Sequence, residues 1–272
     1  MKYVHRPETQ DFGIYGGISI KDNQVQFNWT SDDSNDVIHL VQDCSGEFDD
    51  DGVRYFYGYE YTPHAKGEDK RIFRKYIKSL STDGDTGLYS ENIDEFVENA
   101  VVKFDSACPL SSFGATVHVE SNKEISLVDV MWGYLWEYMH NVDMEFELVK
   151  EAYDNVRFDT AKAFQALIDS GMSEPQAKRT VTKVNIRFND FKAQGKLFQM
   201  KAFVPREIRS GFTNFLKFKS EEEHRAYEAL QGTNVLIFDD LLTSGATIKE
   251  VIRYLKAIHD KNTLTVFILV KQ

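Results

Sequence analysis

The segment Val235-Leu-Ile-Phe-Asp-Asp-Leu-Leu-Thr-Ser-Gly-Ala-Thr247 joins an apolar run to two adjacent acids and a turn of small residues. Four consecutive apolar residues are typical of a strand that is buried on both faces of a parallel sheet. Gly245 suits a tight turn, and apolar residues then recur with helical spacing as far as His259. The segment therefore predicts a strand over 235–239, a turn, and a helix over 247–259, which form one unit of an α/β fold.

The predicted turn has the features of a phosphate-binding site. The first N–H groups of a helix have no partner within the helix, and the helix dipole adds positive partial charge there. Hydroxyl groups can add donors, and a glycine lets the backbone approach a ligand closely. The residues of this turn are Thr243, Ser244, Gly245, Ala246 and Thr247.

Asp239 and Asp240 stand at the carboxyl end of the predicted strand, where open α/β sheets bind their ligands. Two carboxylates beside a bound phosphate would repel it, so we expect them to face another part of the ligand. A vicinal diol such as that of ribose can donate two hydroxyl protons to them. The segment therefore predicts a site for a ribose 5-phosphate.

This order of apolar residues, two acids, two spacers and Thr-Ser-Gly-Ala-Thr resembles the phosphoribosyl-pyrophosphate (PRPP) motif of type I phosphoribosyltransferases. The resemblance implies that Asp239 and Asp240 hold the ribose hydroxyls as the catalytic pair and that residues 243–247 bind the 5-phosphate. It implies a Mg²⁺ ion bound through PRPP, and displacement of pyrophosphate from C1 of the ribose by a nitrogen nucleophile, expected to be a nucleobase. The transition state would have oxocarbenium character, so positioning and charge stabilisation would carry catalysis.

The family also has a pyrophosphate-binding loop after an early strand and a mobile basic loop that closes over the pyrophosphate. We expect the first at residues 105–112, after a strand over 100–104, and an ordinary turn is the alternative. The second is expected within the basic segment 192–210. There Arg206 and Arg209 either clamp a diphosphate in a bidentate manner or are surface charges of a helix.

The chain outside the motif predicts a mainly parallel twisted sheet with flanking helices over residues 86–272, with a helical insertion at about 155–195. Residues 1–85 predict a β-rich amino-terminal elaboration or hood, with a hairpin over 18–29 and a strand over 53–61. Further predicted elements are helices over 68–80, 93–98, 127–140 and 220–232 and strands over 145–149, 198–203 and 264–270. Neither 1–85 nor 155–195 matches a known base-binding hood, so the base stays open.

The 272-residue chain has a formal net charge of -11, which argues against indiscriminate binding to nucleic acid. No apolar run is long enough to span a bilayer, and the amino terminus has no signal-peptide pattern. Cys44 and Cys108 predict neither a disulfide framework nor a zinc site, so we expect a cytoplasmic protein. The expected partners are PRPP and a base, and a homodimer stays open.

Two other functions stay open. The first is a regulatory protein that binds PRPP or a nucleotide on the same fold without transfer, which the poor match of residues 105–112 to a pyrophosphate loop favours. The second is a nucleic-acid-binding protein that uses residues 150–220, where 14 Lys and Arg stand against 7 Asp and Glu. Pyrophosphate release from PRPP tests the first alternative, and salt-sensitive binding to RNA tests the second.

Overall fold

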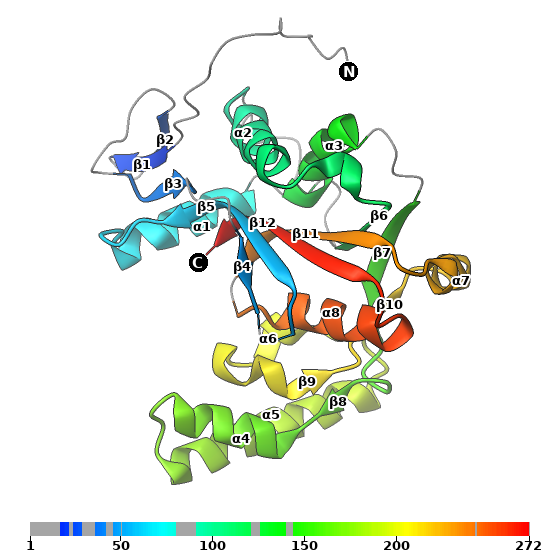
Figure 1. Ribbon diagram of the computed structural model, residues 1–272. Coiled ribbons are helices and arrows are strands. Elements are labelled where there is room, and N and C mark those ends of the chain that lie inside the picture. Colours follow the sequence, from blue (N-terminus) through cyan, green and yellow to red (C-terminus); the bar gives the residue numbers. More distant parts are fainter. Residues whose placement is uncertain are drawn as a thin grey trace, which may run out of the picture.

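The computed structural model describes residues 17–21, 24–28, 36–41, 46–49, 51–79, 91–120, 126–139, 144–242 and 244–271. Its main feature is a twisted sheet with the strand order β10-β7-β6-β11-β12-β5-β3-β1-β2, and β4 pairs with β5 (Figure 1). The strands are β1 (Gly17–Lys21), β2 (Gln24–Asn28), β3 (Ile38–Leu40), β4 (Glu47–Phe48), β5 (Arg54–Tyr61), β6 (Ala115–Val119), β7 (Met144–Lys150), β10 (Leu216–Phe218), β11 (Asn234–Leu242) and β12 (Thr263–Lys271). β8 (Arg157–Phe158) and β9 (Phe212–Thr213) form a separate antiparallel pair.

The centre of the sheet is parallel. β7, β6, β11, β12 and β5 pair in parallel with their neighbours, and the strands outside them pair antiparallel. The helices are α1 (Gly67–Ser79), α2 (Glu91–Ala107), α3 (Leu127–Tyr138), α4 (Thr160–Asp169), α5 (Glu174–Ala193), α6 (Met200–Phe203), α7 (Glu221–Ala229) and α8 (Ala246–Ile258), with short 3-10 helices η1 (Leu110–Ser112) and η2 (Arg206–Gly211). The predicted α/β fold with a mainly parallel sheet is confirmed.

The sheet separates two hydrophobic cores. Val235 and Ile237 of β11 point into a core with the inner face of α8, and we call this the α8 core. Leu236 and Phe238 point into the other core, with α2 and α3, and we call this the α2–α3 core. Figure 1 shows α2 and α3 on one face of the sheet and α8 on the other. Burial on both faces explains why β11 reads as an unbroken apolar run.

The chain reverses its direction across the sheet between β6 and β11. From β6 the chain passes through α3 to β7, and from β11 it passes through α8 to β12, which lies on the other side. β6 and β11 are neighbours, and their helices cover opposite faces. The two connections therefore diverge at the carboxyl ends of β6 and β11. Such a topological switch point is where open α/β sheets form a ligand crevice.

Two predicted strands are wrong. Residues 100–104 belong to α2, because Phe96, Ala100 and Phe104 continue a helical face that is buried against the sheet. The strand that follows α2 in the chain is instead β6, which the sequence patterns above do not predict. Residues 198–203 form no strand: Leu197 makes an isolated bridge to Ala152, and α6 follows.

The amino-terminal region is not a separate sheet. The predicted hairpin is present as β1 and β2, with Gly17 opposite Asn28, and β5 confirms the strand over 53–61. However, β5 pairs in parallel with β12, so that Tyr57 lies opposite Ile268. Residues 54–61 therefore belong to the central sheet, and a division at residue 85 cuts through it.

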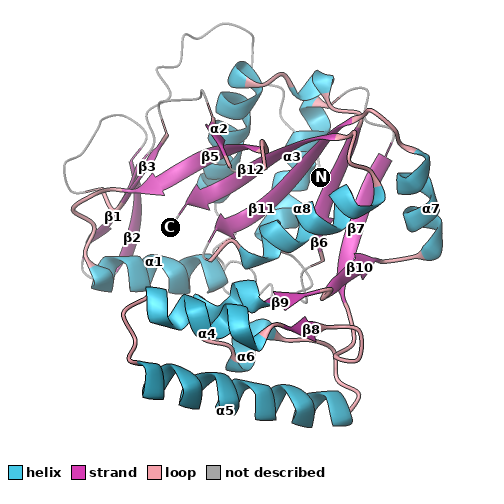
Figure 2. Ribbon diagram, turned by 60° about the horizontal axis from the view of Figure 1, so that its bottom comes forward, coloured by secondary structure: helices cyan, strands magenta, loops and turns pink. Residues whose placement is uncertain are grey.

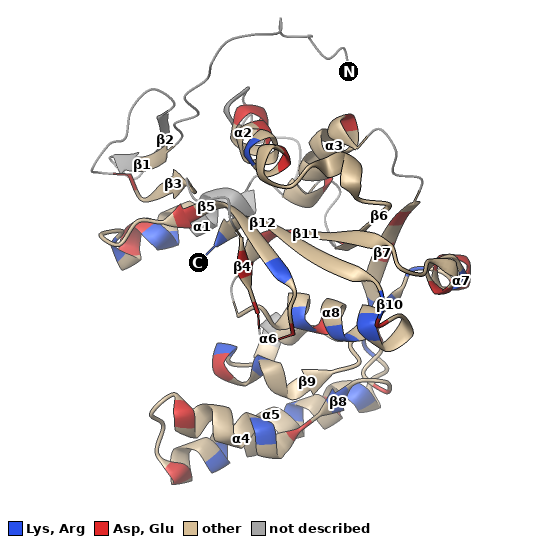
Figure 3. Ribbon diagram, viewed as in Figure 1, with Lys and Arg blue, Asp and Glu red and all other residues tan. Residues whose placement is uncertain are grey.

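The predicted helical insertion is present as α4 and α5. The two helices pack against each other and lie on the same side of the sheet as α8 (Figure 2). Tyr153 centres an aromatic cluster beneath them, with ring centroids 5.1 Å from Phe198 and 5.5 Å from Phe188. Figure 3 shows acidic residues between the basic ones on α4 and α5, so the excess positive charge of residues 150–220 is interspersed there with negative charge.

Candidate functional site

Asp239 and Asp240 are residues of β11, which continues beyond them to Leu242. Asp239 lies opposite Ile268 of β12, and Leu241 opposite Val270. The Asp240 N–H donates to Asp239 Oδ1 at 2.9 Å. The predicted end of the strand at Asp239 is therefore too early, because the strand continues past the pair and Asp239 and Leu241 both pair with β12.

The alternation of side chains changes at this pair. Phe238 and Leu241 both pack into the α2–α3 core, whereas regular alternation would place them on opposite faces. Ile237 and Leu242 likewise both belong to the α8 core. The change of face falls between these residues, and Asp239 and Asp240 are both half-buried. Their carboxylates therefore lie at the carboxyl edge of the sheet rather than inside either core.

The turn that follows leads directly into α8. Gly245 is the N-cap of α8 and has φ +69°, a left-handed conformation that glycine adopts without a steric penalty. Ser244 Oγ accepts from the Ala246 N–H at 3.4 Å, and the first intrahelical bond runs from the Lys249 N–H to Gly245 O at 2.9 Å. The amides of residues 246–248 precede that bond, so they are the ones that a helix amino terminus offers to an anion.

Four of the five predicted turn residues are thus placed at the start of α8, and the fifth, Thr243, lies outside the described residues. Ser244, Gly245 and Thr247 are half-buried, whereas Ala246 is buried. Thr247 lies in the first turn of the helix, the same turn as these amides. The predicted turn between a strand and a helix is therefore present, and its binding of a phosphate stays a prediction.

A buried carboxylate fixes α8 to the rest of the molecule. Glu250 is 3% exposed and accepts the backbone N–H of Phe215 at 3.2 Å. Arg253 donates to the same carboxylate through two N–H groups, at 2.7 and 2.8 Å. Because Glu250 lies one turn after the Gly245 turn, these bonds hold the amino end of α8 in place.

The other side of the switch point is the end of β6 and the start of α3. The Glu120 N–H donates to Leu148 O at 2.8 Å, which holds the strand end in the sheet. Ser126 caps α3: its Oγ accepts from the Asp129 N–H at 3.2 Å, and its own N–H donates to Asp129 Oδ2 at 2.6 Å. Residues 121–125, which join the two, lie outside the described residues.

The expected pyrophosphate loop at residues 105–112 is on the wrong edge of the sheet. Asn234 Nδ2 donates to Ser112 O at 3.1 Å, and the Gly114 N–H donates to Asn234 O at 3.0 Å. Asn234 is the first residue of β11, so this segment lies at the amino ends of the strands. The prediction is wrong because the strand that ends at the switch point is β6, at residues 115–119, and not the expected strand over 100–104. Residues 105–112 therefore precede this strand instead of following it.

The two arginines of the expected clamp both lie in η2. Arg206 is exposed, and Arg209 is half-buried with its Nε donating to Val204 O at 3.3 Å. Burial, with a smaller contribution from Arg206, lowers the pKa of Arg209. This segment lies on the α8 side of the sheet. A role of either arginine in binding a diphosphate stays a prediction.

One polar cluster within the sheet was not expected. His118 of β6 is buried, and its ring nitrogens lie 3.8 Å from Glu145 and 3.7 Å from Glu147, both on β7. Burial lowers the pKa of His118, and the nearby Glu147 partly opposes this. Burial raises the pKa of Glu145, with Glu147 as the next cause. The sequence offers only a histidine between two valines as a signal for it.

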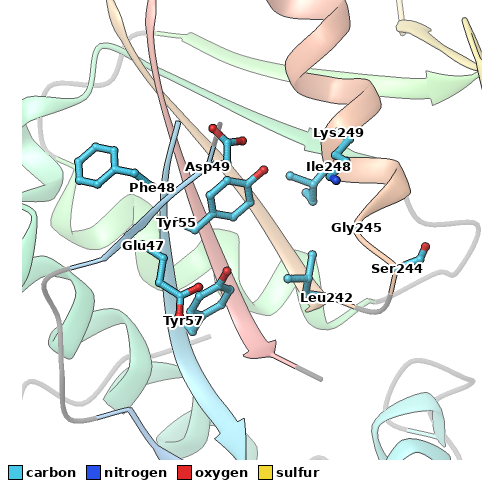
Figure 4. A pocket seen from close by; sticks show the side chains of 10 residues that line it. All are labelled: Glu47, Phe48, Asp49, Tyr55, Tyr57, Leu242, Ser244, Gly245, Ile248 and Lys249. Atoms are coloured by element: carbon cyan, nitrogen blue, oxygen red, sulfur yellow. The ribbon is translucent and has the colours of Figure 1, made fainter. Parts of the chain in front are cut away.

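A cavity of about 260 Å³ opens beside the phosphate turn (Figure 4). Leu242, Ser244 and Gly245 form one end of it, and Tyr55 and Tyr57 of β5 lie across from them. The sequence shows the tyrosines only as a period-two pattern and residues 47–52 only as an acidic turn. No local signal connects either with residues 243–247, since long-range pairing through β12 brings them together.

No family model matches this chain, and no curated protein matches it. Among solved structures, the chain is similar to a hypothetical protein from Neisseria gonorrhoeae with bound ppGpp, at a TM-score of 0.33 and 13% identity, over 67% of this chain and 68% of that chain. A match at that level carries no argument about the ligand of the present chain. No helix in the described ranges is both long and apolar enough to cross a membrane.

Proposed function

We propose that this chain is a phosphoribosyltransferase, which transfers 5-phosphoribose from PRPP to a nitrogen nucleophile, a nucleobase in the first instance, and releases pyrophosphate. One observation carries the proposal. Asp239 and Asp240 and the left-handed Gly245 turn lie on one continuous piece of backbone, at the carboxyl ends of β6 and β11 where the sheet has its switch point. This is the geometry that a ribose and its 5-phosphate require.

Each part of the site would have its own task. The amides of residues 246–248, with the hydroxyls of Ser244 and Thr247, would bind the 5-phosphate. Asp239 and Asp240 would accept the two ribose hydroxyls and so fix the orientation of C1. Fixing C1 between a leaving group and a nucleophile lowers the barrier by positioning, without a covalent intermediate. The rigid pairing of β11 in the sheet suits this task.

Mg²⁺ fits the residues present if the ligand brings most of its coordination. Within the described ranges, no three His, Cys, Asp or Glu side chains are grouped to hold a metal ion. Mg²⁺ is commonly bound through one or two carboxylates together with substrate phosphates and water. Asp239 and Asp240 could supply such carboxylates beside a bound pyrophosphate. The ion would neutralise charge that develops on the leaving group.

A regulatory protein that binds PRPP or a nucleotide without transfer is the second candidate. The observation that favours it is the position of residues 105–112 at the amino ends of the strands, away from the crevice. Turnover distinguishes this candidate from an enzyme.

The first experiment measures PRPP binding by calorimetry with Mg²⁺, for the wild type and for Asp239→Asn and Asp240→Asn. We expect each substitution to weaken binding by about tenfold or more, corresponding to about 1.4 kcal/mol, because an amide cannot accept as strongly as a carboxylate. Asp260→Asn removes an exposed carboxylate beyond the far end of α8 and serves as the matched control. If both variants bind PRPP as the wild type does, the site is wrong.

The second experiment measures pyrophosphate release from PRPP with Mg²⁺ and a panel of nucleobases. Release that depends on one base, and that falls in Asp239→Asn and Asp240→Asn, supports the transferase. Tight PRPP binding without release for any base supports the regulatory candidate. Unfolding curves of the variants must match those of the wild type, since loss of the fold would also abolish binding.

A further inference from the structure

The cavity beside the phosphate turn is lined by two aromatic rings of the sheet. The rings of Tyr55 and Tyr57, two residues apart on β5, lie 6.5 Å apart between centroids, with an angle of 26° between their planes. Ile248 and Lys249 of α8 form the wall on one side (Figure 4). Tyr55 is buried and Tyr57 is half-buried, so this aromatic surface belongs to the sheet and does not need to form on binding.

The opposite wall is acidic and comes from the β4–β5 hairpin. Glu47 and Asp49 line the cavity there. The Tyr57 hydroxyl hydrogen-bonds to Glu47, and the Tyr55 hydroxyl hydrogen-bonds to Asp49. Burial, followed by the charge of these carboxylates, raises the pKa of both tyrosines, so the phenols stay protonated donors. The carboxylates are therefore held in place by groups of the protein itself.

Both carboxylates keep free capacity to accept hydrogen bonds. Asp49 accepts the N–H groups of Asp51 and Val53 at 3.0 and 2.8 Å, besides the Tyr55 hydroxyl. Glu47 accepts from Lys271 at 2.6 Å, besides Tyr57. An ionised carboxylate has about four acceptor positions. Because an ionised carboxylate cannot donate, the remaining positions accept only from donor groups of a ligand, such as the N–H groups of an amino substituent.

The size and place of the cavity restrict the ligand further. At about 260 Å³ it is smaller than the roughly 300–1,000 Å³ typical of drug-sized ligands, so it suits a single heterocycle rather than a whole nucleotide. Leu242, Ser244 and Gly245 line its end, and the same residues form or adjoin the phosphate turn. A ligand in the cavity would therefore stand next to a ribose held by that turn.

We propose that this cavity binds the nitrogen nucleophile of the reaction, and that the nucleophile is a planar heterocycle bearing an amino group. The inference rests on the proposed function for the identity of the reaction, but binding of the heterocycle can be measured without it. The ring stacks on Tyr55 and Tyr57, as aromatic ligands do on tyrosine. Its amino group donates to Glu47 or Asp49.

The test uses pairs of bases that differ by one amino group: adenine and purine, guanine and hypoxanthine, cytosine and 2-pyrimidinone. Each is titrated into the full-length protein by calorimetry, with and without ribose 5-phosphate, and KM is measured for any base that turns over. In the pair that binds most tightly, we expect the amino-bearing base to bind at least tenfold more tightly than its partner. Glu47→Gln should reduce that ratio. Equal binding within every pair, or no binding of any base by a protein that binds PRPP, overturns the inference.

A blocking variant tests the location. Lys249 is exposed at the cavity wall, so Lys249→Trp places a large side chain in the cavity without disturbing the core. Lys249→Ala removes the same charge without filling the space and is the matched control. We expect Lys249→Trp to weaken base binding at least tenfold relative to Lys249→Ala, with PRPP affinity within twofold between the two. Equal base affinity in the two variants would show that the base binds elsewhere.

These outcomes separate the two proposals. If Lys249→Trp blocks an amino-bearing base while PRPP does not bind at all, the cavity is confirmed and the phosphoribosyltransferase is wrong. If PRPP binding depends on Asp239 and Asp240 while Lys249→Trp leaves base binding unchanged, the PRPP site is supported and the assignment of the cavity to the base is wrong.

Discussion

Replacing Glu250 by alanine tests whether one buried carboxylate fixes α8, and with it the phosphate turn, to the sheet. The carboxylate bonds to two kinds of partner. The Phe215 N–H is a buried backbone donor at 3.2 Å, and the Arg253 guanidinium donates at 2.7 and 2.8 Å. The Arg253 side chain is 41% exposed, so water can replace the carboxylate around it but not around the Phe215 N–H.

These exposures give the magnitude. Leaving the buried Phe215 N–H without an acceptor costs about 1–3 kcal/mol. The ion pair adds about 1 kcal/mol or less, because the half-exposed guanidinium regains water. We therefore expect Glu250→Ala to lower the free energy of unfolding by about 1–4 kcal/mol in total. Glu250→Gln keeps an oxygen for the Phe215 N–H and should cost only about 1 kcal/mol.

Urea unfolding followed by far-UV circular dichroism measures both variants, with equal m-values required so that the midpoints report stability. Glu137→Ala, at an exposed carboxylate in the last turn of α3, is the matched control and should change stability by less than about 0.5 kcal/mol. If Glu250→Gln destabilises the protein as much as Glu250→Ala, the acceptor for Phe215 is not what matters. If neither differs from the control, the buried carboxylate does not fix α8.

Three further predictions concern the turn, the α2–α3 core and the polar cluster. Gly245→Ala should cost about 1–2 kcal/mol, because alanine is strained at φ +69° although Leu242 leaves room for its Cβ at 3.6 Å. Gly171→Ala, at φ +89° in open space, is the control and should lower the free energy of unfolding in urea by about the same amount. Only Gly245→Ala should weaken PRPP binding, and equal PRPP affinities of the two variants would contradict the turn assignment. Tyr59→Phe removes a buried hydroxyl that donates to Phe96 O at 3.0 Å and should cost about 1 kcal/mol in urea unfolding, whereas an unchanged midpoint would refute that bond. Burial lowers the pKa of His118 in the folded protein. Below the unfolded pKa of about 6.5, the unfolded chain therefore binds a proton that the folded chain does not bind. The free energy of unfolding is thus expected to fall as the pH drops through that value. Glu145, whose pKa is raised, acts in the opposite sense at lower pH, so the difference between wild type and His118→Gln isolates the histidine; identical pH slopes would contradict its burial in the neutral form.

Sequence patterns predict those parts of the fold that local chemistry specifies. The β11–α8–β12 unit follows from an apolar run, a glycine and a helical period, and α7 begins where Ser220 accepts the Glu223 N–H at 3.1 Å. α2 is misread because Ala100, Val101 and Phe104 fit both a short strand and a helical face. For a run of that length, periodicity alone does not distinguish the two.

The candidate site is predictable only to the extent that it lies on one segment. Asp239, Asp240 and the Gly245 turn are contiguous, and the sequence identifies them together. The switch point depends on the pairing of β6 with β11, and the aromatic cavity depends on the pairing of β5 with β12, in which Tyr57 meets Ile268. Such pairings join residues far apart in the chain and leave no local pattern. For the same reason, the sequence pattern places residues 54–61 in an amino-terminal elaboration, whereas they lie in the central sheet.

The place of the cavity orients the whole proposed reaction. The cavity lies on the β5 side of the turn, so a base bound there approaches the ribose from that side of β11. The pyrophosphate of PRPP is then expected on the β6 side of β11. A base in the cavity and a pyrophosphate toward β6 stand on opposite sides of β11, which carries Asp239 and Asp240. Displacement at C1 needs that opposition, since the nucleophile enters from the side that the leaving group does not occupy.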